Sequence, residues 1–308
     1  VMETSQSSHL PDNKIKAIDR VIDETPVLPG QQLKLLQWAA DYYHHPIGEV
    51  LFTALPNLLK QGQSTQVSGE TIWQLTESGK SLDPLDLKRA PKQSGLLQLL
   101  QQMAATVSAE HLNGIFENWR PAMQALQSKQ LVISKEGPCL DMNTTQGIPA
   151  PELNDEQQQA VTEIAQSLDQ FNAFLLQGIT GSGKTEVYLA LVEKIIQQGN
   201  QALVLVPEIS LTPQLTRRFQ QRLGVPIAAL HSGLNDRQRL CAWTLAAENK
   251  VQVIIGTRSA LFTPLPNLKL IIIDEEHDGS LKQQEVFRYN ARDLALVTAR
   301  NANIPIVL

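Results

Sequence analysis

The second half of the chain alternates short, continuous apolar runs with segments of helical spacing. Strands buried on both faces of a sheet are apolar at every position, whereas half-exposed strands alternate. The runs therefore predict a parallel sheet with crossover helices, which is an α/β fold. The expected strands are Ala173–Gln177, Ala202–Val206, Ile227–Leu230, Val251–Ile255, Leu268–Ile273 and Ile304–Leu308.

The first half has a different pattern. Residues 12–62 show helical apolar spacing, and residues 63–92, rich in Gln, Ser, Gly and Pro, predict loops with one short strand near Ile72 and Trp73. A helix is expected from Ser94 to Met103.

The order helix, turn, helix, strand follows in residues 108–134. Ser108 is a typical N-cap, Pro121 can open a second helix through Gln127, and Leu131–Ser134 predicts a strand. This order is typical of a winged helix. In some proteins a winged helix binds DNA, and in others it binds a protein partner. Residues 142–152 contain one glycine and two prolines and are expected to be a linker.

Composition limits the classes of function. A hydrophobic fraction of 42% and a charged fraction of 19% are those of ordinary globular proteins. The net charge of −5 provides no overall basic field, so any contact with nucleic acid would need locally placed Lys and Arg.

The location of the protein is predicted from its cysteines and apolar runs. Cys139 and Cys241 are too few for a four-cysteine zinc site and fit a reducing cytoplasm, where we expect them to be inert. No apolar run approaches the roughly 20 residues of a membrane span, and the first residues lack the plan of a signal peptide. We expect a cytoplasmic protein that does not bind membranes. An apolar strand at the very end favours a piece of a longer chain.

A phosphate-binding loop is predicted after the first strand of the second half. Residues 178–185 match G-x-x-x-x-G-K-[ST], and they lie between the apolar run Ala173–Gln177 and a helical segment, the context that this motif requires. The alternative, a glycine-rich turn without a ligand, does not explain that context. The expected ATP-binding residues of the loop are Gly178, Ile179, Thr180, Gly181, Ser182, Gly183, Lys184 and Thr185. Lys184 would reach the β- and γ-phosphates, and the Thr185 hydroxyl would hold Mg²⁺.

A pair of carboxylates follows the strand Leu268–Ile273. Strands of an open α/β sheet place the residues that follow them at the edge where ligands bind. We therefore expect Asp274 to join Thr185 in the Mg²⁺ shell and Glu275 to polarise the attacking water, with Lys184 as the third catalytic residue. Without the phosphate loop, a solvated acidic turn would be the simpler interpretation.

The loop and the sequence Asp274-Glu275-Glu276-His277 together are similar to superfamily 2 helicases. Longer segments resemble one family within them, the bacterial primosomal replication-restart helicases, or PriA family. These segments are residues 38–48, 202–214, 231–235, 255–259 and 282–294, so the resemblance extends over nearly the whole chain.

This resemblance implies an ATP-driven, Mg²⁺-dependent enzyme that unwinds DNA from 3′ to 5′ at stalled forks and assists primosome assembly. It implies forked and single-stranded DNA, single-strand-binding protein and other primosome proteins as partners. Residues 1–62 would be the C-terminal part of a 3′-end DNA-binding domain, 63–148 the winged helix and 149–308 a RecA-like first motor lobe. The second lobe and its zinc-binding insertion would lie outside this chain, so no zinc is expected here, and the chain alone is expected to be inactive.

Other motor positions are assigned by resemblance and by their chemistry. Gln157 lies in a segment that resembles the adenine-reading glutamine motif, although a polar helix start is an alternative. Thr212, beside the helix-opening Pro213, is expected near a DNA phosphate. Thr257 and Arg258 follow a strand and are further candidates for phosphate contact, with a surface turn as the alternative.

A segment after the carboxylates interleaves cations with aromatic rings. Such a pattern is typical of single-stranded DNA binding, where bases stack on rings. The expected DNA-binding residues are Lys282, Phe287, Arg288 and Tyr289. The PriA family has an aromatic-rich loop here, and this chain departs from it with Leu281 in place of an aromatic residue and Phe287 in place of Trp.

Two rival functions remain open at the level of sequence. The chain could belong to another superfamily 2 DNA translocase, or it could be a DNA- or protein-binding module that uses ATP only as a switch. Strand displacement would separate a helicase from a switch.

Overall fold

The computed structural model describes residues 11–308 except 12–13, 17, 67–68, 70, 104–105, 140–146 and 180. Residues 142–146 of the expected linker at 142–152 and Thr180 of the predicted loop therefore lie outside the described residues.

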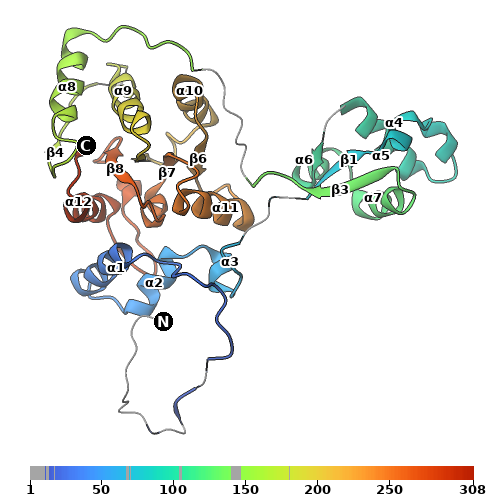
Figure 1. The fold of residues 1–308 in the computed structure, drawn as a ribbon, viewed down its shortest axis with the longest axis horizontal. Helices are drawn as coiled ribbons and strands as arrows, with labels where there is room; N and C mark the ends of the chain where they lie inside the picture. Colours follow the sequence, from blue (N-terminus) through green and yellow to red (C-terminus); the bar gives the residue numbers. More distant parts are fainter. Residues whose placement is uncertain are drawn as a thin grey trace.

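Among the described residues, the second half of the chain contains a six-stranded sheet, and all its paired strands are parallel (Figure 1). The strand order is β4-β9-β8-β5-β7-β6. The strands are β4 (Ala173–Phe174), β5 (Gln201–Leu205), β6 (Ile227–Leu230), β7 (Val253–Gly256), β8 (Leu268–Ile273) and β9 (Ile306–Val307). The expected α/β fold is confirmed, and each apolar run overlaps a strand. The first and last strands are shorter than predicted, although Leu176 still donates a backbone hydrogen bond of 2.8 Å to Leu308.

Helices cover both faces of this sheet because its central strands are buried on both sides. Along β5, Ala202 and Val204 face one core, and Leu203 and Leu205 face the other. The first core contains side chains of α8 (Asp155–Ala165), α9 (Lys184–Gln197) and α10 (Pro213–Leu223), and the second those of α11 (Asp236–Ala247) and α12 (Ala291–Ala302).

The N-terminal helices pack on the second face. They are α1 (Gly30–Tyr42), α2 (Ile47–Ala54) and α3 (Asn57–Lys60). Leu35, Leu36 and Ala39 of α1 belong to the same core cluster as Leu294 and Ala295 of α12. These helices are therefore held to the lobe by a shared core, and their membership of a 3′-end DNA-binding domain stays a prediction.

The middle of the chain forms a separate unit with its own core (Figure 1). Its antiparallel sheet has the order β2-β1-β3, with β1 (Thr71–Leu75), β2 (Val107–Ser108) and β3 (Val132–Glu136). Its helical elements are α4 (Glu77–Ser81), the 3-10 helix η2 (Pro84–Leu87), α5 (Pro91–Met103), α6 (Ala109–Ile115) and α7 (Trp119–Ser128). Ser108 caps α6 as expected, whereas α7 begins at Trp119, two residues before Pro121. The order α6, α7, β3 is the predicted one, and the identity of this unit as a winged helix stays a prediction.

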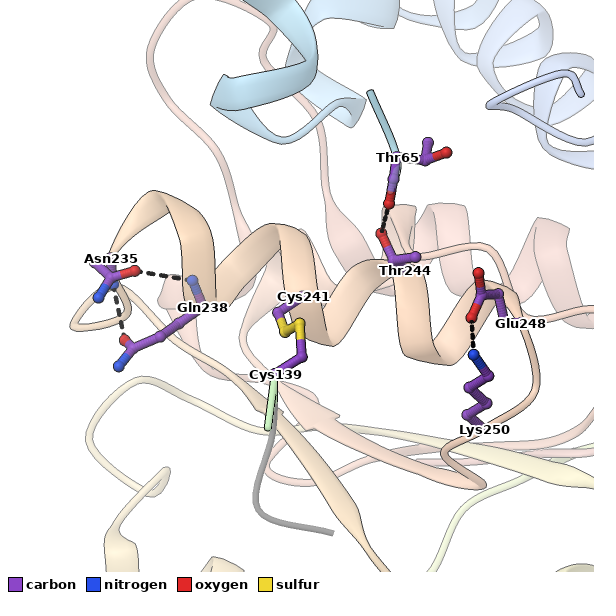
Figure 2. Close-up of a disulfide and its surroundings, with 8 residues drawn as sticks. All are labelled: Thr65, Cys139, Asn235, Gln238, Cys241, Thr244, Glu248 and Lys250. Atoms are coloured by element: carbon purple, nitrogen blue, oxygen red, sulfur yellow. Dashed lines mark hydrogen bonds and ion pairs between the residues drawn. A yellow bond between two sulfur atoms is a disulfide. The ribbon is translucent and has the colours of Figure 1, made fainter. Parts of the chain in front are cut away.

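Both ends of the middle unit lie beside α11 (Figure 2). Thr65, before β1, accepts a hydrogen bond of 3.2 Å from the Thr244 hydroxyl of α11. Cys139, after β3, is paired with Cys241 of α11 in a disulfide that joins residues 102 positions apart. We expected inert cysteines; the structure brings the two together because α11 lies where the chain leaves the middle unit.

No helix among the described residues is both long enough and apolar enough to cross a membrane.

Candidate nucleotide and nucleic-acid site

The predicted phosphate loop lies between β4 and the first residue of α9, Lys184. Gly181 and Gly183 have φ angles of +85° and +87°, in the left-handed region that disfavours other residues. A Cβ at Gly183 would also collide with the amide nitrogen of Gln157. These glycines therefore let the backbone curl in front of the helix, whose unpaired N–H groups and positive dipole end favour an anion.

The Lys184 ammonium lies between the loop and the carboxylates that follow β8. Its Nζ donates to the Gly178 carbonyl at 3.0 Å and to Glu275 Oε1 at 3.2 Å. The Lys184 side chain is 19% exposed and that of Glu275 34%, so solvent reaches the pair. The cation is thus placed at the mouth of an anion-binding loop, with one carboxylate as its temporary counter-charge.

The residues after β8 are held in an uncommon backbone conformation. Asp274 continues the sheet by donating its N–H to Leu205 O at 2.9 Å. Glu275 has a φ of +49°, which is uncommon for a residue with a side chain and costs conformational energy. This turn directs the two neighbouring carboxylates toward α9, because Glu275 reaches Lys184 and Asp274 reaches Tyr188.

Tyr188 is a site residue that the sequence analysis missed. It lies one helical turn after Lys184, and its hydroxyl donates to Asp274 Oδ1 at 3.2 Å. The side chain is 4% exposed. Burial raises the pKa of Tyr188, and the neighbouring Asp274 charge raises it further, so the hydroxyl stays a donor. The four-residue spacing was the available signal, since residues at i and i+4 share one helix face.

The pKa of Asp274 is raised above the usual value of an aspartate, mainly by burial. The hydrogen bond from Tyr188 and the Lys184 charge oppose that shift, whereas the Glu275 charge adds to it. Two carboxylates beside one lysine leave negative charge for a divalent cation to neutralise, which is how the residues present fit Mg²⁺.

The chain provides few Mg²⁺ ligands of its own. Among the described residues no group of three or more His, Cys, Asp or Glu could hold a metal ion. Mg²⁺ bound with a nucleotide needs only one or two protein ligands, because phosphates and waters fill the other positions. Thr185, half-buried at the start of α9, and Asp274 are the residues that could hold it.

Gln157 lies against the phosphate loop, but its amide oxygen and its amide nitrogen each already form a hydrogen bond. Its Oε1 accepts from Asn154 N at 3.1 Å as part of a capping box for α8, and its Nε2 donates to Ser182 O at 3.2 Å. In this structure Gln157 fastens α8 to the loop, and adenine reading would require one of these bonds to exchange.

The three predicted phosphate contacts on the strand ends differ in exposure. Thr212 is exposed and caps α10 by accepting from Leu215 N at 3.2 Å, and Pro213 opens that helix as expected. Thr257 is only 5% exposed. Arg258 donates through Nη1 to Ser280 O at 2.9 Å, which ties it to the turn after the carboxylates.

The aromatic segment alternates in burial. Lys282 and Arg288 are exposed, whereas Phe287 and Tyr289 are 0% and 4% exposed. Phe287 packs on Tyr43 and His45 at the end of α1, and Tyr289 packs on Phe262. In this structure neither ring is open to a base, Phe287 because Tyr43 and His45 cover it and Tyr289 because it packs on Phe262, so base stacking by these two residues stays a prediction. Of the four residues predicted to bind DNA in this segment, Lys282 and Arg288 face solvent.

Comparison with known protein families gives one match for the second half of the chain and another for its start. Residues 150–299 match the family described as "Type III restriction enzyme, res subunit", and residues 1–56 match the PriA family of "3'DNA-binding domain (3'BD)". The chain is 40% identical to the replication restart protein PriA of Haemophilus influenzae over 100% of its own length and 43% of that protein. It is 36% identical to the PriA of Chlamydia pneumoniae, over 96% of the chain and 40% of that protein.

The chain belongs to the PriA family. It spans about two fifths of the length of these two PriA proteins. Among solved structures it is similar to the UvsW helicase from bacteriophage T4, with a TM-score of 0.38 and 17% identity over 55% of the chain and 56% of that structure, a likeness too weak to carry an argument.

Proposed function

We propose that the chain provides the nucleotide-binding lobe of an ATP-dependent DNA helicase that acts in replication restart. The observation that carries this proposal is the position of Lys184, which is held between the phosphate loop and Glu275. A triphosphate requires a cation for its phosphates and carboxylates that hold Mg²⁺ and orient water. Both kinds of group come together where Lys184 contacts Glu275.

The residues would share the work as follows. Gly178, Ile179, Thr180, Gly181, Ser182 and Gly183 would wrap the phosphates with backbone N–H groups, and Lys184 would leave Glu275 for the β- and γ-phosphates. Thr185 and Asp274 would hold Mg²⁺, which neutralises phosphate charge when bound. Glu275, released by Lys184, would then orient the attacking water. The ion pair of 3.2 Å would thus keep the base inactive until a nucleotide takes the lysine.

DNA is the proposed partner of the same lobe. Lys282 and Arg288 are exposed and Thr212 stands at a helix N-terminus, so these three support backbone contacts. Thr257 and Arg258 would act by shaping the turn, since one is buried and the other bonds to Ser280. The middle unit would be the winged helix, and residues 1–62 would belong to the 3′-end DNA-binding domain.

The family suggests finer features that we also propose. These are translocation from 3′ to 5′, forked and single-stranded DNA as substrates, and single-strand-binding protein and primosome proteins as partners in the cytoplasm. Zinc would belong to parts of the protein outside this chain.

The proposal is tested with a fluorescent ATP analogue and Mg²⁺ added to the chain, and with strand displacement by a protein that joins this chain to a second motor lobe. We expect saturable binding that Lys184→Ala weakens by at least about tenfold, and unwinding that depends on ATP. ATP-dependent DNA binding without unwinding would support the switch and refute the helicase.

A further inference from the structure

A second cavity lies at the other end of the sheet from the phosphate loop. Its volume is about 340 Å³, and it opens where α3 meets α11 and the ends of β6 and β7. The nucleotide site centres on Lys184 and on Glu275, which follows β8, and β8 lies three strand spacings, roughly 14 Å, from β6. No residue of the nucleotide site lines the cavity, so the two sites are distinct.

Two cations line this cavity with a single carboxylate. Lys60 comes from α3, Arg239 from α11, and Asp236 is the only acidic residue among those lining the cavity. Asp236 Oδ1 accepts from Asn57 Nδ2 at 2.9 Å, and Lys60 donates to Asn57 Oδ1 at 3.2 Å. Neither cation forms an ion pair with any described residue.

The electrostatics of the cavity favour an added anion. Burial lowers the pKa of Lys60, the Asp236 charge opposes that shift, and the Arg239 charge adds to it. Arg239 donates a hydrogen bond of 2.8 Å from Nη2 to the His231 carbonyl. A ligand with negative charge would relieve the repulsion between the two cations, and Arg239 has further N–H donors for it.

Neutral donors surround the same space. Ser232 follows β6 and Ser259 lies in the 3-10 helix after β7; both are exposed and line the cavity. Trp243 of α11 also lines it, and its indole Nε1 is buried without a hydrogen-bond partner among the described residues. The indole N–H is closed to solvent and does not donate into the cavity, but the side chain forms part of the cavity wall, so its NMR signal can report on a ligand bound there.

We infer that this cavity binds a phosphate group, supplied either by a nucleic-acid backbone or by free phosphate ion. Donors approach from α3, from α11 and from the ends of β6 and β7, which suits a tetrahedral anion better than a planar carboxylate. Gly256 makes the approach of the last two elements possible, because a Cβ there would lie 2.8 Å from Leu230 O. The inference does not rest on ATP binding, whereas the backbone source would extend the proposed DNA contacts to the N-terminal helices.

The test follows the indole N–H signals of the ¹⁵N-labelled chain by NMR. The chain has four tryptophans, and Trp243→Phe identifies the signal of interest. All titrations use the Lys184→Ala background, so that phosphate held by the phosphate loop cannot contribute and failure of the nucleotide proposal does not affect the result. Inorganic phosphate is added in one arm and a short single-stranded oligothymidylate in the other.

We expect saturable movement of the Trp243 signal in the phosphate arm, and Lys60→Ala should weaken binding about tenfold, as for a lost charged hydrogen bond. Lys80→Ala, which removes one surface cation from the middle unit, should leave it unchanged. If the Trp243 signal moves in both arms, the phosphate group comes from the DNA backbone. If it moves with inorganic phosphate alone, the ligand is the free phosphate ion. Binding that survives Lys60→Ala, or a Trp243 signal that moves in neither arm while the other three signals show an intact fold, overturns the inference.

Discussion

Lys184 has two partners in the structure, the Gly178 carbonyl and the Glu275 carboxylate. Replacing it with alanine removes the cation at the mouth of the loop while leaving the α9 backbone in place. We expect Lys184→Ala to weaken ATP binding by at least about tenfold, the loss of one charged hydrogen bond. Equilibrium binding of a fluorescent ATP analogue measures this. Lys194→Ala, on the exposed side of the same helix, is the matched control and should bind normally; equal losses in both variants would refute the role of Lys184.

Glu275 should matter for turnover and not for binding. Glu275→Gln keeps the size of the side chain but removes the charge that orients water, so hydrolysis should fall by roughly 10²–10⁴-fold. Binding should hold or tighten, because Lys184 loses its competing partner. The measurement pairs nucleotide binding with turnover in the protein that carries a second lobe. If this variant no longer binds nucleotide, the division of roles between Asp274 and Glu275 is wrong.

Tyr188 should act through Asp274. Tyr188→Phe removes the hydroxyl that donates to the carboxylate at 3.2 Å and keeps the buried ring. We expect about 1 kcal/mol of lost stability and a few-fold rise in the Mg²⁺ concentration that half-saturates nucleotide binding. Binding without Mg²⁺ should not change. A purely structural role predicts the loss of stability without the Mg²⁺ effect.

At the scale of elements, the segment 282–290 is a short hairpin with one face on the core. Gln283 N donates to Tyr289 O at 2.8 Å, and Asn290 N donates to the Tyr43 hydroxyl of the N-terminal helices at 3.2 Å. The N-terminal helices thus contact the segment that follows the carboxylates Asp274 and Glu275.

Substitutions on the buried and the exposed face of this hairpin should have different effects on stability and DNA binding. Phe287→Ala should cost about 3–5 kcal/mol of unfolding free energy, because the ring is fully buried. Arg288→Ala, at the neighbouring exposed position, should leave stability nearly unchanged and weaken DNA binding. Thermal unfolding and DNA binding of both variants decide this. A stable Phe287→Ala chain with weak DNA binding would restore base stacking as the role of the ring.

At the scale of the whole molecule, the Cys139–Cys241 pair ties the end of the middle unit to α11 and closes a loop that contains α8, α9 and α10. Alkylation of the unreduced chain under denaturing conditions should label neither cysteine, and prior reduction should expose both, which mass spectrometry counts. A reducing cytoplasm would favour the dithiol form, so the tether is expected to depend on the redox state. Full labelling of the purified, air-exposed chain without reduction would contradict the pairing.

The sequence by itself determined the α/β lobe and the position of the phosphate loop in it. Its strands are buried on both faces and are therefore apolar throughout, and the phosphate loop is a contiguous motif whose glycines are needed where φ is positive. Gly183, Lys184 and Asp274 could be assigned because local backbone geometry and strand order suffice to place them. The same is true of Ser108 and Pro213, whose roles at the start of a helix depend only on their immediate neighbours.

Only the tertiary structure decided which side chains face solvent in the aromatic segment and what meets across long sequence separations. Phe287 is buried because α1, more than two hundred residues earlier, covers it, and no local pattern distinguishes a ring that stacks on bases from one that packs on a helix. The same applies to Tyr188 beside Asp274, to Cys139 beside Cys241 and to Lys60 beside Arg239. Burial and pairing depend on elements distant in sequence, and these come together only when the sheet and its covering helices have formed.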